Sequence, residues 1–71
     1  MKFYVTYGND SKLKHCYSEI ESNSFMSARQ EVDRITKGKF AFFYDEHRFA
    51  GQIVKYGLTK VPLQPAESTV W

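Results

Sequence analysis

A strict alternation of apolar and polar positions opens the chain. In residues 2–7, Phe3, Val5 and Tyr7 alternate with more polar neighbours, and a period of two predicts a strand with one buried face. Turn-forming residues follow at positions 8–11. Residues 12–21 alternate more weakly and carry charges typical of an edge strand.

Helical spacing replaces this alternation between residues 25 and 37. Apolar residues recur three or four positions apart, at Phe25, Ala28, Val32 and Ile35. This spacing places them in one stripe on a helix. Ser24 is suited to cap its N-terminus, and Gly38 suits the left-handed position after its end.

The densest apolar run lies at residues 39–51, where five apolar or aromatic residues precede four charged or titratable ones. It predicts a central strand that is buried on both faces near its middle and ends in a polar corner. Asp45 is placed to cap a second helix, which Gly57 ends. Residues 58–63 predict a last short strand, limited by Pro62.

These elements predict one α+β domain over residues 1–63. Its small mixed sheet is built in the order strand, strand, helix, strand, helix, strand. A right-handed crossover after the first two strands places the third strand beside the first. We expect both helices on one face of the sheet, which leaves aromatic side chains on the other face. Residues 64–71 are expected to form a flexible C-terminal tail.

Composition adds constraints on stability and location. A chain of 71 residues buries a small core, and its single cysteine, Cys16, excludes an internal disulfide and favours a reducing compartment. Aromatic residues make up 17% of the chain. Because they exceed what one layer of helices covers, we expect a homodimer. No apolar run approaches the ~18 residues needed to cross a bilayer, so we expect a cytoplasmic protein without a membrane partner.

Chemical motifs are weak throughout the chain. His15 and Cys16 are neighbours on a predicted strand and therefore point to opposite faces. They cannot pair there as a thiol nucleophile and its base. Asp45, Glu46 and His47 lack a recognised metal-ligand spacing, and no glycine-rich phosphate loop is present. We therefore expect a protein that is not an enzyme and that uses no metal or cofactor.

A resemblance supplies context. The opening Phe3-Tyr4-Val5-Thr6-Tyr7-Gly8, then Ala28-Arg29, Lys39-Phe40-Ala41-Phe42-Phe43-Tyr44-Asp45 and Tyr56-Gly57-Leu58, resemble a group of small proteins encoded by bacteriophages. The resemblance covers the chain up to about Val61 and implies no particular activity. It implies an accessory protein of the kind that binds and inhibits host machinery, defence systems included.

Protein binding is the function that we expect. Tyrosine and arginine are frequent anchors at interfaces, and the predicted contact residues are Tyr4, Tyr17, Tyr44, His47 and Arg48. The expected partner is a host protein, met in the host cytoplasm.

Single-stranded nucleic acid is the alternative partner. The aromatic run of residues 40–44 beside Phe3 and Tyr4 would then form a platform on which bases stack. The formal charge of +2 is low for a dedicated nucleic-acid binder and makes this alternative the weaker one.

Overall fold

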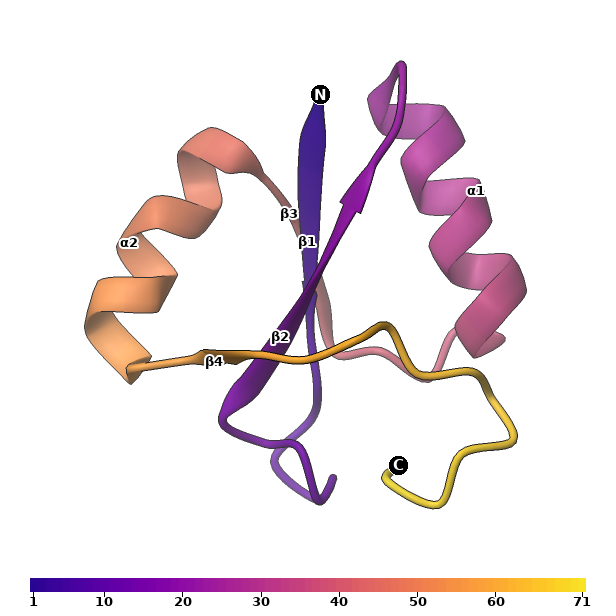
Figure 1. Cartoon of the computed structure of the whole chain (residues 1–71), viewed down its shortest axis with the longest axis vertical. Coiled ribbons are helices and arrows are strands. Elements are labelled where there is room, and N and C mark those ends of the chain that lie inside the picture. Colours follow the sequence, from indigo (N-terminus) through magenta and orange to yellow (C-terminus); the bar gives the residue numbers. More distant parts are fainter.

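A single four-stranded sheet runs through the middle of the molecule, in the order β3-β1-β2-β4 (Figure 1). The computed structural model describes all residues, 1–71. Its elements are β1 (Lys2–Thr6), β2 (Cys16–Glu21), α1 (Phe25–Thr36), β3 (Phe42–Asp45), α2 (Glu46–Tyr56) and β4 (Thr59–Lys60). β1 pairs antiparallel with β2 and β3, while β4 pairs parallel with β2. The predicted α+β class, mixed sheet and element order are confirmed.

The two helices cover opposite faces of the sheet, which corrects the expectation of one shared face (Figure 1). Phe3 lies 5.9 Å from Phe25 of α1, whereas Tyr4 lies 4.3 Å from Phe49 of α2, measured between ring centroids. Neighbouring residues of a strand point to opposite faces.

The direction of the two crossovers explains this arrangement. The connection through α1 runs from β2 across β1 to β3, and the connection through α2 runs back from β3 to β4. Parallel crossovers are almost always right-handed. Two such crossovers in opposite directions therefore place their helices on opposite faces, as in doubly wound sheets.

The aromatic run forms an edge strand, which corrects its predicted central position. β3 has four residues and pairs with one strand, β1, which lies between β3 and β2. The third strand does pair with the first, as predicted. The burial predicted near the middle of the run is also wrong, because Phe42 is exposed and Phe43 and Tyr44 are half-buried. An apolar run indicates side chains that favour cover. It does not report how many strands flank the backbone.

Helix ends follow the predicted caps. The Ser27 amide donates to Ser24 Oγ over 3.1 Å, and the Arg48 amide donates to Asp45 Oδ1 over 2.8 Å. Gly57 ends α2 in the left-handed conformation, with φ 59°. α1 ends earlier than predicted, because Lys37 also adopts a left-handed conformation with φ 53°.

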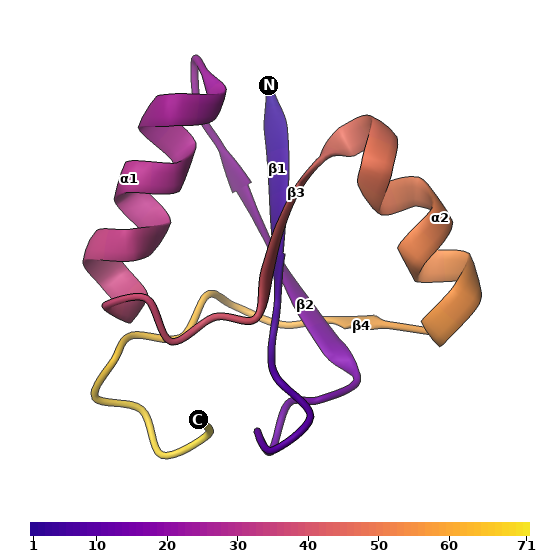
Figure 2. The same cartoon turned by 180° about the vertical axis from the view of Figure 1, so that it is seen from behind.

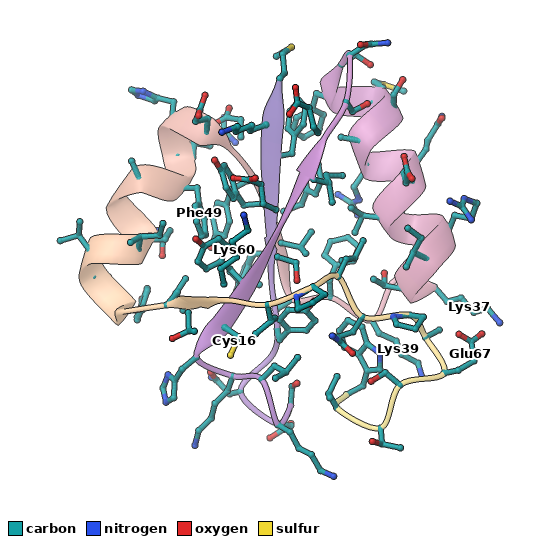
Figure 3. The ribbon with its side chains drawn as sticks, viewed as in Figure 1. Cys16, Lys37, Lys39, Phe49, Lys60 and Glu67 are labelled. Carbon is teal, nitrogen blue, oxygen red and sulfur yellow. The ribbon has the colours of Figure 1, made fainter.

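Residues 64–71, expected to form a flexible tail, lie against the domain (Figure 1). The Ala66 amide donates to the Ile35 carbonyl over 2.9 Å, and the Lys12 amide donates to the Val70 carbonyl over 2.8 Å. Figure 3 shows Lys39 beside this segment, and its Nζ donates to the Ala66 carbonyl over 3.0 Å. The segment thus connects the end of α1 to the turn after β1.

Candidate functional site

Aromatic side chains form one cluster on each face of the sheet. Under α1, the Phe43 ring lies 5.7 Å from Phe3 and 5.1 Å from Phe25, between centroids. The Arg29 guanidinium lies 4.9 Å from the centroid of Phe40 at the border of this cluster. Cation–π contact of this kind holds the arginine over the rings.

The second cluster brings together three of the predicted contact residues. Figure 3 shows Phe49 pointing from α2 toward the strands. Its ring lies 4.3 Å from Tyr4, 4.8 Å from Tyr17 and 5.8 Å from Tyr44, between centroids. Phe49 is 2% exposed and Tyr4 is 8% exposed. These rings therefore fix α2 to the sheet, and Tyr4 offers a partner little surface.

Burial also raises the pKa of two of these tyrosines. Desolvation raises the pKa of Tyr4 above its ordinary value of 10.0, and the nearby carboxylate of Glu19 raises it further. Desolvation raises the pKa of Tyr44 in the same way, with a smaller contribution from Tyr56. Both hydroxyls are neutral donors at physiological pH.

His47 and Arg48, the other two predicted contact residues, are exposed in the first turn of α2. Arg48 Nε lies 4.0 Å from Asp45 Oδ2. The five predicted residues therefore do not form one surface. Three pack beneath the helix, and two lie exposed at its start.

A groove of about 450 Å³ lies at the other end of α2. It is bounded by the end of β1, the start of β3, the turn before β2 and the last turns of α2. Its lining residues are Thr6, Tyr7, Gly8, Asn9, Lys14, His15, Ala41, Phe42, Tyr44, Gln52, Tyr56 and Leu58. The lining contains Lys14 and His15 and no carboxylate. Four phenylalanine and tyrosine residues and two basic ones therefore form a surface suited to an apolar group next to an anionic one.

Two of the groove's rings are open to solvent. Phe42 is 62% exposed and Tyr56 is 54% exposed. The Phe42 ring lies 6.1 Å from Tyr44, and Lys55 Nζ lies 5.2 Å from the centroid of Tyr56. Sequence reasoning did not single out Phe42 as exposed, because it lies within an apolar run. The alternation of β3 places it on the α2 face, but only the fold shows that α2 leaves it uncovered.

The outer edge of β3 is free along its length. Figure 2 shows β3 in front of the other strands, with neither helix nor the C-terminal segment crossing it. Phe42 belongs both to this edge and to the groove. The exposed edge and the groove therefore adjoin at Phe42.

The platform expected for base stacking is covered. Phe3 and Phe43 lie beneath α1, and Tyr4 and Tyr44 pack against Phe49 of α2. RNA-recognition sheets stack bases on an open face, and both faces of this sheet carry a helix (Figure 2). Only Phe42 among the sheet aromatics is widely exposed.

Two features considered in the sequence, the free cysteine and the candidate metal ligands, can be placed in the structure. Cys16 is half-buried at the start of β2, near the lower end of the sheet in Figure 3. No three histidine, cysteine or carboxylate side chains gather in a geometry that could hold a metal ion. Neither helix has the length and apolarity that a bilayer span requires.

Comparison with known proteins adds no assignment: no protein-family model, curated protein or solved structure matches the chain.

Proposed function

We propose that this chain is a non-enzymatic protein-binding module whose contact surface is the groove at the end of α2. The observation that carries the proposal is the 62% exposure of Phe42 at a groove also lined by Tyr44 and Tyr56. Covering one large apolar side chain contributes about 1.5–3 kcal/mol. Two exposed rings that line one groove therefore supply the anchor of an interface.

The resemblance to small bacteriophage proteins supports a partner from the host. We propose that the module binds a host protein in the host cytoplasm and inhibits it by occupying its surface. Binding of this kind needs no reactive group. Of the predicted contact residues, Tyr44 alone lines this groove, and His47 and Arg48 lie at the far end of α2.

We still predict a homodimer, but through a different surface from the one first expected. The aromatic face that first suggested it is covered by α2 (Figure 1). The remaining surface for self-association is the groove and the free edge of β3.

Retention of host proteins on the immobilised module tests the proposal. A Phe42→Ala, Tyr56→Ala double variant should lose the retained protein, because both exposed anchors are gone. The matched control is Met26→Ala with Val54→Ala, whose side chains are 68% and 85% exposed and lie outside the groove. This control should retain the protein as the wild type does.

Nuclease treatment and salt separate protein from nucleic-acid partners. Contacts to phosphates weaken steeply as salt rises. An aromatic interface should persist in about 0.5 M salt, where screening acts over only a few ångströms. If the retained material is nuclease-sensitive and elutes early in the salt gradient, nucleic-acid binding replaces the proposal.

A further inference from the structure

The sheet has two unpaired edges, and they differ in protection. On one side, β4 covers β2 only at Cys16 and Tyr17. The following stretch of β2 is guarded by Glu19 and Glu21, and Glu19 is bound by Lys60 over 3.5 Å. Charges at such positions discourage the pairing of further strands.

The β3 edge lacks these devices. Its first three residues, Phe42–Tyr44, are aromatic, and the strand contains no lysine and no proline. Its one charge, Asp45, is engaged as the cap of α2, where it accepts from the Arg48 amide over 2.8 Å. An edge of this composition is open to main-chain pairing with an added strand.

Basic groups lie on both faces of the sheet, in the groove that adjoins this edge and over a ring of β3. Lys14 and His15 line the groove on the α2 face. On the α1 face, the Arg29 guanidinium lies 5.9 Å from the ring centroid of Phe43. Arg29 is half exposed, and its contact with Asp33 over 3.4 Å is a solvent-exposed helix pair of low strength. A strand added to β3 would carry side chains toward the groove on one face and toward Arg29 on the other.

We infer that the partner of this module contributes an extended, acidic segment that adds to the outer edge of β3 as a fifth strand. Main-chain hydrogen bonds to β3 provide the pairing, since each strand offers an unpaired row of donors and acceptors. Side chains on one face enter the groove beside Phe42, and acidic side chains lie next to Lys14 and Arg29. The inference rests on the proposed function and specifies the kind of segment that is bound.

Three fluorescein-labelled octapeptides test this inference by fluorescence anisotropy. The first alternates valine and glutamate, the second alternates valine and lysine, and the third alternates proline and glutamate. The third peptide keeps the acidic charge, but it has no backbone N–H at its proline positions and cannot pair as a regular strand. The valine–glutamate peptide should bind at least about tenfold more tightly than either of the others.

Variants of the module locate the binding edge. Phe42→Lys and Lys14→Glu should each weaken the valine–glutamate peptide about tenfold or more. The controls are Val54→Lys, which adds a charge at an exposed apolar position of α2, and Lys37→Glu, which reverses a charge at the end of α1. Both controls should bind the peptide with an affinity within about twofold of that of the wild type, because substitutions at exposed positions have small effects.

The outcomes separate this inference from the proposed function. Equal binding of the proline–glutamate peptide would show charge attraction alone and overturn strand addition. If no peptide binds, yet the double alanine variant loses a host protein, the groove functions without an added strand. If sedimentation instead finds a dimer that Phe42→Lys dissociates, and no peptide binds, a second copy occupies the edge. Loss of every peptide and of host-protein retention contradicts both proposals.

Discussion

The rings of Tyr4 and Phe49 lie almost parallel, with centroids 4.3 Å apart and an angle of 8° between their planes. This contact joins the central strand to α2 and closes the face that would otherwise display Tyr4. Offset aromatic pairs add about 0.5–1.5 kcal/mol beyond the area that they bury. The stack therefore holds in place the helix that forms one wall of the groove.

Phe49→Ala should destabilise the protein by about 3–5 kcal/mol, because it leaves a cavity among three tyrosine rings. For a small domain this is a large part of the total stability. Urea unfolding followed by circular dichroism measures the change. Phe49→Leu should cost less, and Val54→Ala on the exposed side of α2 should change stability by about 0.5 kcal/mol at most. Equal effects of Phe49→Ala and Val54→Ala would contradict the packing described here.

Truncation after Leu63 should lower the free energy of unfolding by about 2–5 kcal/mol, from the net value of several hydrogen bonds and some apolar burial. The lost contacts include the Gln64 amide donating to the Tyr7 hydroxyl over 3.2 Å and the Ser11 hydroxyl donating to the Val70 carbonyl over 2.6 Å. Thermal unfolding of the truncated chain checks this. Trp71→Ala should reproduce part of the loss, since its ring lies 5.0 Å from Tyr7. Thr69→Ala, at an exposed position, should have little effect. An unchanged melting temperature for the truncated chain would contradict a stabilising role for residues 64–71.

Alkaline pH should destabilise the fold through two tyrosines. Burial raises the pKa of Tyr4 and of Tyr44 above 10.0. Above pH 10 the unfolded chain therefore loses these protons while the folded chain keeps them, and stability falls as pH rises. Urea unfolding at a series of pH values from about 8 to 11.5 should show this decline from the ordinary tyrosine pKa upward. A Tyr4→Phe, Tyr44→Phe double variant should decline less steeply; the same slope in both proteins would rule out this origin.

Lys37→Gly should stabilise the protein by about 0.5–1 kcal/mol. A left-handed conformation costs a residue with a Cβ atom about 1–2 kcal/mol, and the greater freedom of glycine in the unfolded chain offsets part of the gain. Lys37 has φ 53°. Gly57→Ala is the opposite test, because Gly57 has φ 59°. This substitution should lower the free energy of unfolding by a similar amount. Glu67→Gln controls for the exposed ion pair between Lys37 and Glu67, seen together in Figure 3, with atoms 3.8 Å apart.

Local sequence signals predicted the parts of the fold that depend on local chemistry. Ser24, Asp45 and Gly57 mark helix ends because capping is decided within one turn of the chain. The stripe that includes Ala28 and Val32 predicted the buried side of α1, and both residues are fully buried. These features needed no knowledge of distant contacts.

Features set by the path of the chain were not predictable from these signals. Phe43 and Tyr44 of β3 are half-buried, Phe42 is exposed, and the backbone of β3 has a neighbour on one side only. The hydrophobicity of the run indicated neither the exposure of Phe42 nor the edge position of the strand. The groove likewise joins Lys14, Phe42 and Tyr56 from three separate segments. It appears only once the second crossover has placed α2 on its own face.

The docking of residues 64–71 against the end of β1 also has a consequence for biosynthesis. Tyr7 is synthesised well before Gln64, yet its hydroxyl contacts Ser18 and the Gln64 amide. Synthesis proceeds at about 5–20 residues per second and from the N-terminus. The hairpin and α1 can form while translation continues, but the surroundings of Tyr7 are complete only after the C-terminal segment has left the exit tunnel.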